Sequence, residues 1–153
     1  MRQGTSPFRA VVTAALEEAR RRGDRRLGTD HLLLGLLHDA DSEPARALGV
    51  DLAAARLALD SLDRRALRAL GIDVDAVEDR GPLKHPPVPL SAVTSTARAV
   101  LARGVRATTA KTRARAPLHL LLALLDRARP DPAAELLVEL GIDAESVRAR
   151  LAL

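Results

Sequence analysis

Apolar and polar positions follow a helical period near the N-terminus. Between residues 8 and 22, apolar or small side chains recur every three or four positions, and charged side chains fill the positions between them. This spacing places the apolar side chains on one face of a helix and the charges on the other. Gly23 follows, and a glycine just past the last periodic residue commonly ends a helix. The pattern therefore predicts an amphipathic helix over residues 8–22.

The next apolar run, residues 32–37, has almost no polar position. A helix that is hydrophobic on nearly every face is normally buried. Thr29 stands where its hydroxyl could cap this helix, and Asp30 would place a carboxylate at the positive end of the helix dipole. We therefore expect a buried helix that begins near residue 29.

Two further helices are marked by their ends. Pro44 suits the start of a short helix that runs to Leu48, and Gly49 suits its C-terminal stop. Asp51 can cap the helix after it, which we expect to reach about residue 62.

The sequence repeats itself at two scales. A Leu-Gly-aliphatic-Asp tetrapeptide occurs at residues 48–51, 70–73 and 140–143, and each copy fits a helix end, a glycine stop and an aspartate cap. At the larger scale, the His-Leu-Leu-Leu block at residues 31–37 recurs 88 residues later, at residues 119–125. Each block follows an amphipathic stretch and precedes proline-containing short helices.

These repeats predict an all-α fold built as a tandem duplication of a four-helix repeat. The first repeat covers about residues 8–62 and the second about residues 90–153. An extra helical segment, about residues 63–80, belongs to the first copy. Residues 81–89 contain four prolines and are predicted to be the linker, because proline interrupts regular helix.

Composition agrees with a single all-helical domain of 153 residues. Apolar residues make up 47% of the chain and aromatic residues only 1%, so the core depends on aliphatic side chains, among which leucine and alanine favour helices. The chain has no cysteine, which excludes disulfides and thiolate metal sites. No apolar run reaches the length of a membrane span, and the N-terminus has no signal-peptide core. We expect a cytoplasmic protein without a membrane anchor.

The net charge of +4 is distributed unevenly. Residues 81–125 contain no acidic side chain but carry seven basic ones. Three interpretations remain open: a solvated helix face, a contact surface for an acidic protein partner, and, least favoured, a nucleic-acid surface. The scarcity of aromatic side chains argues against base stacking. The candidate contact residues are Arg98, Arg103, Arg106, Lys111, Arg113 and Arg115.

No catalytic motif is present. The chain lacks a phosphate-binding glycine loop with its lysine, and it lacks a Gly-x-Ser-x-Gly nucleophile turn. His31 and His119 occupy matching places in the two blocks. Two histidines without cysteines or paired carboxylates make a poor zinc site, so a structural hydrogen bond is the favoured role. The sequence predicts a non-enzymatic protein with no metal and no cofactor.

The first repeat resembles a known family. Residues 17–19, 28–37 and 45–49 are similar to the Clp N-terminal repeat, which occurs twice at the front of ClpA- and ClpC-type unfoldases. The resemblance implies two four-helix repeats related by a pseudo-two-fold axis, which recruit substrates and adaptors for an ATPase ring. The chain ends where the ATPase modules of that family would begin, so we expect the recruiting part alone.

Departures from the family pattern limit what can be transferred. Asp30 stands where the family usually has Glu, and residues 116–119 of the second copy lack both the threonine and the acid. The family's usual Phe-Thr pair is replaced by residues 4–5 in the first copy. In the ClpC-type branch, the threonine–acid corner binds phosphorylated arginine. The resemblance therefore implies ligand-binding roles for Thr29 and Asp30 only, and a plain helix cap is the alternative.

The combined expectation is a protein- or peptide-binding module. It would act as an adaptor of a Clp unfoldase-protease, or as a decoy for the ligands of that machine. Its partners would be a Clp ATPase, the adaptors or substrates of that ATPase, or a small peptide-like ligand. The alternatives are a nucleic-acid-associated regulator that uses residues 98–115, and a purely structural or oligomerisation domain.

Overall fold

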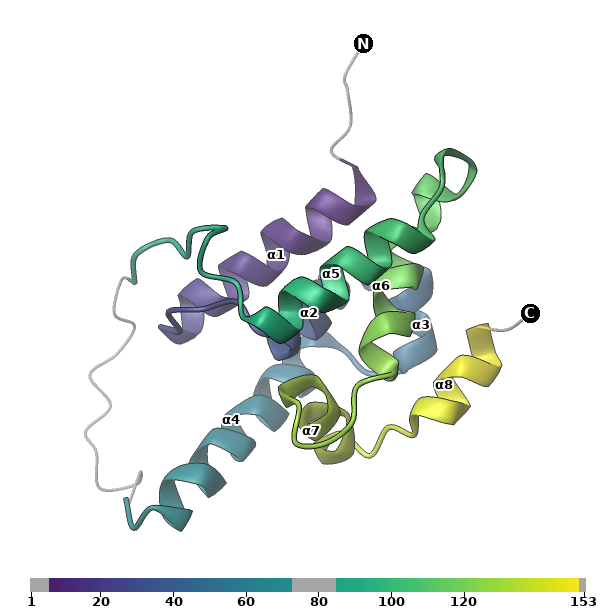
Figure 1. The fold of residues 1–153 in the computed structure, drawn as a ribbon. Helices are drawn as coiled ribbons and strands as arrows, with labels where there is room; N and C mark the ends of the chain where they lie inside the picture. Colours follow the sequence, from purple (N-terminus) through teal and green to yellow (C-terminus); the bar gives the residue numbers. More distant parts are fainter. Residues whose placement is uncertain (1–5, 73–84, 152–153) are drawn as a thin grey trace.

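The computed structural model describes residues 6–72 and 85–151, and these ranges are all-helical, as the sequence predicts. Figure 1 shows the helices as a single cluster, from which one helix projects. The only β-type pairing in the described ranges is an isolated parallel bridge between Leu27 and Val93. The elements are α1 (Pro7–Arg22), α2 (Thr29–Leu36), α3 (Glu43–Leu48), α4 (Leu52–Ala69), α5 (Ser95–Ala107), the 3-10 helix η2 (Ala110–Arg115), α6 (Ala116–Leu125), α7 (Pro132–Glu139) and α8 (Ala144–Leu151).

Several predictions made from the sequence fall on residues outside these ranges. They are residues 4–5, the later part of the extra segment (73–80), the aspartate that closes the middle tetrapeptide, and the first part of the linker (81–84) with its Lys84.

Helix ends follow the local signals. The Ser6 hydroxyl oxygen accepts a hydrogen bond from the Arg9 N–H at 3.1 Å, and Gly23 ends α1 in the left-handed region at φ 74°. Asp51 caps α4 as predicted, with the Ala54 N–H donating to its Oδ1 at 2.8 Å. These bonds satisfy backbone groups that a helix end leaves without partners.

The buried centre of the molecule is formed by α2 and α6. Both carry leucines with no exposed surface, and α1 packs against α2 as α5 packs against α6. Gly35 permits the close approach of α1, because a Cβ atom at this position would lie 2.6 Å from the Val11 carbonyl oxygen. The continuous apolar runs at residues 32–37 and 118–125 therefore form the core. No helix in the described part of the chain is long and apolar enough to cross a membrane.

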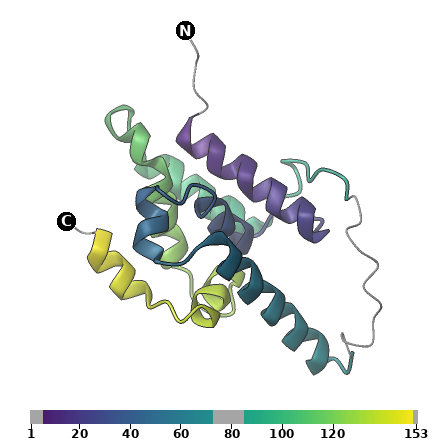
Figure 2. The same cartoon turned by 180° about the vertical axis from the view of Figure 1, so that it is seen from behind.

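The fourth helix is longer than predicted. The expected end at residue 62 is wrong, because α4 continues without a break to Ala69, where Leu70 and Gly71 (φ 81°) end it. No glycine or proline interrupts residues 52–70, so nothing local stops the helix. Its C-terminal half extends away from the other helices in both views (Figure 1, Figure 2). The described start of the extra segment is therefore a continuation of α4.

Candidate functional site

The N-terminal end of α2 is held by its own histidine. His31 Nδ1 accepts a hydrogen bond from the Gly28 N–H at 2.9 Å, so the ring proton lies on Nε2. His31 Nε2 then donates to Asp24 Oδ2 at 2.7 Å. This hydrogen bond is the largest influence on Asp24 and lowers the pKa of its carboxyl group, against the opposing effect of burial. Both ring nitrogens thus serve structural bonds.

The buried side chain of Thr29 joins α2 to the start of α7 by hydrogen bonds. It is the first residue of α2, and Gly28 is the N-cap, so the prediction of a Thr29 cap is wrong. The Thr29 hydroxyl donates to Asp131 Oδ1 at 2.6 Å and accepts from the Ala133 N–H at 3.1 Å. Only 1% of Thr29 is exposed. Since Asp131 caps α7, one hydroxyl connects two helix starts that are distant in the sequence.

Asp30 lies beside Thr29 but faces the surface. Its Oδ1 accepts a hydrogen bond from the His31 N–H at 3.0 Å, and 17% of its side chain is exposed. Asp30 lines an open depression of about 410 Å³ together with Gly28, Thr94 and several arginines. Its carboxylate is therefore the part of the predicted threonine–acid corner that a ligand in this depression could touch.

The corresponding corner of the second half is built differently. Arg115 precedes α6 without a side-chain cap, and Pro117 occupies its first turn. His119 Nε2 is buried and has no hydrogen-bond partner in the described part of the chain. Thr112 stands 88 residues after Asp24, and it bonds within η2 to the Thr109 N–H. The acid that holds His31 thus has no counterpart for His119.

A buried ion-pair network on α1 was not foreseen from the sequence. Glu18 is 1% exposed, and its carboxylate accepts hydrogen bonds from Arg56 Nε at 3.1 Å and from His38 Nε2 at 2.8 Å. Burial raises the pKa of Glu18, but the bonds and charges of Arg56 and His38 outweigh it, and the net pKa is lowered. The burial of Glu18 could have been predicted, because this residue shares a helical face with Val11 and Ala15.

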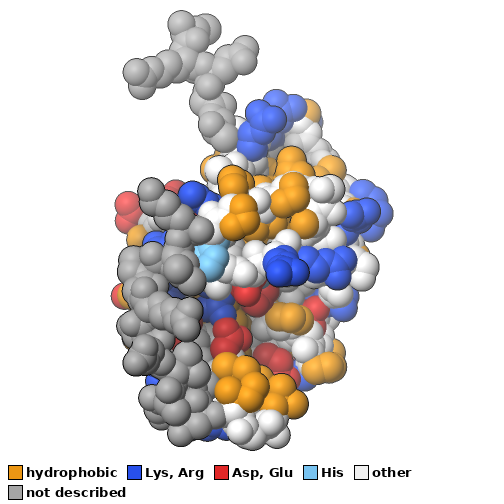
Figure 3. Space-filling model, turned by 90° about the vertical axis from the view of Figure 1, so that its left-hand side faces the viewer, with side chains coloured by type: hydrophobic (Ala, Val, Ile, Leu, Met, Phe, Trp, Pro, Cys, Tyr) orange, Lys and Arg blue, Asp and Glu red, His pale blue; other side chains and the backbone are white. Residues whose placement is uncertain are grey.

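Arg22 forms a second network that joins α1 to α4. Its guanidinium contacts Asp24 at 3.2 Å and Asp60 at 2.8 Å, and it also pairs with Asp63. On the side of the molecule that lies to the left in Figure 1, acidic and basic side chains lie close together between two hydrophobic patches (Figure 3). Among the described residues, no group of three or more histidines and carboxylates has the spacing of a metal site.

The six basic candidates within residues 98–115 do not form one uniformly available charged surface. Arg103 pairs with Asp126, and Arg115 donates to Glu43 Oε1 at 2.9 Å. Both acids lie outside the acid-free residues 81–125, so these pairs could not be predicted from the charge pattern of that stretch. The other four basic candidates are exposed, and no acid in the described ranges lies within ion-pair distance of them: Arg98, Arg106, Lys111 and Arg113.

Comparison with known proteins supports the resemblance at the first half of the chain. Residues 3–66 match the family model of the Clp repeat (R) N-terminal domain, and this stretch includes α1, α2, α3 and most of α4. A comparison with curated proteins gave no match. The likeness recognised at residues 17–49 is thus confirmed, and the match extends it to residues 3–66.

Proposed function

We propose that this protein is a non-catalytic binding module of a Clp unfoldase-protease system, acting either as an adaptor that delivers cargo or as a decoy that withholds ligands. The observation that carries the proposal is the Clp repeat match over residues 3–66. The proposed partners are a Clp ATPase, its adaptors or substrates, or a small peptide-like ligand. Domains of this type usually work in the cytoplasm, which we propose as the compartment here.

For the ligand corner we propose divided roles for Thr29 and Asp30. Asp30 lines the open depression at the start of α2, and a carboxylate there can bind a guanidinium or ammonium group of a peptide. Thr29 would position this corner, because its hydroxyl is bonded to Asp131 and to the Ala133 N–H. The second half, with Pro117 and Leu118 at the equivalent place, would supply no such contact.

We also propose that the two halves are copies of one four-helix repeat related by a pseudo-two-fold axis. Two features support this. Gly49 and Gly141 both follow short proline-initiated helices and both adopt positive φ, 72° and 70°. The buried helices α2 and α6 start 87 residues apart and both carry the leucine block. A crystal structure in which residues 8–62 fail to superpose on residues 90–153 would refute the duplication.

Binding to a purified Clp ATPase, with and without its peptidase, tests the function. We expect the tagged protein to retain the ATPase or one of its substrates. An adaptor should then accelerate degradation of the bound cargo, and a decoy should slow it. Retention of neither would overturn the proposal.

The Asp30 contact has a matched test. Asp30→Asn should weaken binding of a peptide-like ligand about tenfold, because a charge-assisted hydrogen bond is lost. Asp41→Asn, an exposed aspartate in the α2–α3 loop, makes the same chemical change and should leave the affinity within about twofold. Isothermal titration calorimetry measures both, and equal affinities for the two variants would exclude Asp30.

A further inference from the structure

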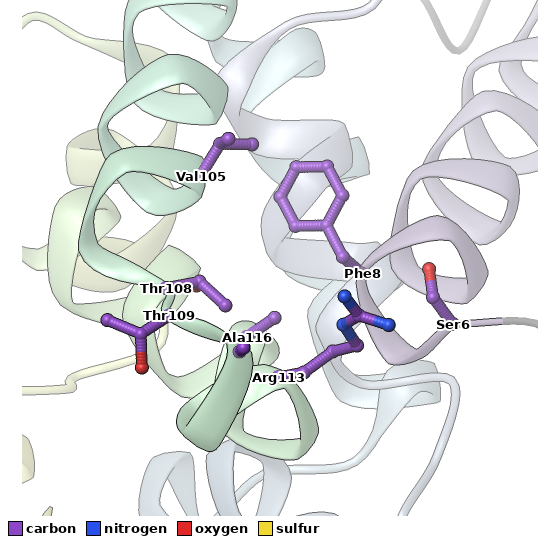
Figure 4. A pocket seen from close by; sticks show the side chains of 8 residues that line it. Ser6, Phe8, Val105, Thr108, Thr109, Arg113 and Ala116 are labelled. Carbon is purple, nitrogen blue, oxygen red and sulfur yellow. The ribbon is translucent and has the colours of Figure 1, made fainter.

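A pocket of about 410 Å³ lies between the start of α1, the end of α5 and η2. Phe8, Val105 and Ala116 supply its apolar surface, and Arg113, Thr108 and other polar residues lie around it. In Figure 4 the Phe8 ring and the Val105 side chain point into the space between their two helices, and Arg113 extends from η2 toward the Ser6 side.

The apolar part of this pocket is left accessible. Phe8 is the only aromatic residue of the chain, and it is half-buried here instead of joining the core. Val105 is 55% exposed at the same place. Aromatic side chains contribute large apolar areas to cores and interfaces, so an open pocket that holds the single aromatic ring favours insertion of an apolar side chain from a partner.

The rim of the pocket is positively charged. Arg113 lines it, and Arg106 and Lys111 are exposed on the same two elements. No acid in the described ranges lies within ion-pair distance of these three, whereas Arg103 and Arg115 of the same stretch are paired with Asp126 and Glu43. Three of the four unpaired cations of this stretch thus lie on the two elements that border the pocket, where they attract an anionic partner.

We propose that this pocket docks an acidic peptide segment of a partner protein. One apolar side chain of the segment enters against Phe8 and Val105, and its neighbouring carboxylates contact Arg113 and the cations beside it. This inference rests on the proposed function and names the class of partner. A nucleic acid fits less well, because one half-buried ring cannot stack successive bases, and a phosphate backbone offers no apolar side chain to the pocket.

The probe is a short fluorescein-labelled peptide with a central Leu-Phe pair and two glutamates on each side, titrated with the full chain. Val105→Asp and Arg113→Glu should each weaken binding by about tenfold or more, through loss of apolar contact and by charge repulsion. Both side chains are exposed, so circular dichroism and thermal melting should be unchanged. Arg98→Glu makes the same charge change at the other end of α5 and should alter the affinity by less than about threefold.

Several results would overturn the proposal. One is unchanged affinity of Val105→Asp and Arg113→Glu for the peptide. Another is equal binding of a peptide whose Leu-Phe pair is replaced by Gly-Ser, because charge alone would then explain the affinity. A third is tighter binding of duplex DNA that displaces the peptide and is weakened by the same variants.

The experiments distinguish failure of the proposed docking pocket from failure of the proposed function. Retention of a Clp ATPase is measured on the same Val105 and Arg113 variants and on Asp30→Asn. Asp30 lies at the start of α2 and does not line this pocket. Loss of peptide binding with intact retention of the ATPase supports the pocket assignment. Peptide binding without retention of the ATPase or any of its substrates rejects the proposed function alone.

Discussion

At the scale of single residues, Glu18 illustrates how position on a helix determines the state of a charge. It lies on the buried side of α1, and Arg56 and His38 supply its hydrogen bonds. An ionised carboxylate in this position needs both partners, because burial alone would favour its neutral form. The preceding residue, Glu17, is half-exposed, and its carboxylate makes only a 3.5 Å contact with Arg20.

Glu18→Gln should therefore lower the free energy of unfolding by about 1–3 kcal/mol, because it leaves Arg56 without its buried counter-charge. Glu17→Gln removes the same charge one position away and should change stability by less than about 0.5 kcal/mol. Urea denaturation followed by circular dichroism measures both. Equal stabilities of the two variants would mean that the buried network contributes little.

The pH dependence follows from the same carboxylates. The pKa of Glu18 lies below its ordinary value of 4.5, and that of Asp24 below 3.8. A depressed carboxyl pKa contributes stability that is complete above the ordinary value and is lost as the pH falls through the folded value. Asp63 has a raised pKa and acts in the opposite direction.

We expect the unfolding free energy to fall as the pH is lowered below about 4.5. The decrease should be smaller in Glu18→Gln, since one of the depressed groups no longer titrates. Urea midpoints measured between neutral and acidic pH provide the comparison. Parallel pH profiles for the two proteins would contradict the assigned shift.

At the scale of elements, the contact between α1 and α2 depends on a missing side chain. Gly35 lies inside α2, where a glycine costs helix stability, yet an added Cβ atom would be 2.6 Å from the Val11 carbonyl oxygen. Gly104 lies inside α5, and its nearest contact would be 3.5 Å, from Leu120 Cα. An added Cβ atom would therefore clash with backbone at Gly35, whereas at Gly104 it would make only ordinary van der Waals contacts.

Gly35→Ala should lower the free energy of unfolding by about 1–2 kcal/mol, because α1 must move away from α2. Gly104→Ala should raise it by about 0.5–1 kcal/mol, through better helix propensity and a more restricted unfolded chain. Thermal denaturation of the pair gives shifts of opposite sign. Stabilisation by both substitutions would show that α1 and α2 adjust without cost.

At the scale of the whole molecule, contacts between distant segments join the two halves of the chain. Leu27 exchanges backbone hydrogen bonds with Ala92 and Thr94, at 2.8 Å and 2.9 Å. Arg65 of α4 pairs with Glu139 of α7. Thr29 of α2 is bonded to Asp131 at the start of α7. The helices of the first half are thus fixed to those of the second through polar groups as well as through the leucine core.

Thr29→Val keeps the volume of the side chain but removes the hydroxyl that serves Asp131 and the Ala133 N–H. We expect a loss of about 1–3 kcal/mol of unfolding free energy, because buried polar groups lose a partner. Thr13→Val, at an exposed position of α1, is the matched control and should change stability by less than about 0.5 kcal/mol. Urea denaturation measures both variants, and equal stabilities of Thr29→Val and Thr13→Val would refute the prediction. Amide exchange at Ala133 would not report this bond alone, because the Ala133 N–H also donates to Asp131 Oδ1 at 3.0 Å.

The features that could be predicted from the sequence are those encoded over one or two helical turns. The periodicity of residues 8–22, the uninterrupted leucines of residues 32–37, and the glycine stops at Gly23 and Gly49 specify helices, their ends and their burial. The aspartate cap of α4 was predicted in the same way. The end of α4 was predicted too early. The helix continues because no residue before Gly71 stops it.

By itself, the sequence of this protein therefore determined an all-helical chain, its buried helices and its likeness to the Clp repeat. Only the tertiary structure decided which charges are available and which hydroxyls are buried. The Thr29 hydroxyl is hydrogen-bonded to Asp131, 102 residues away. Arg103 and Arg115 are paired with acids from other elements. The pocket at Phe8 arises where α1, α5 and η2 meet. The physical reason is that helix formation follows local hydrogen bonds and periodicity, whereas pairing and exposure depend on how distant helices pack.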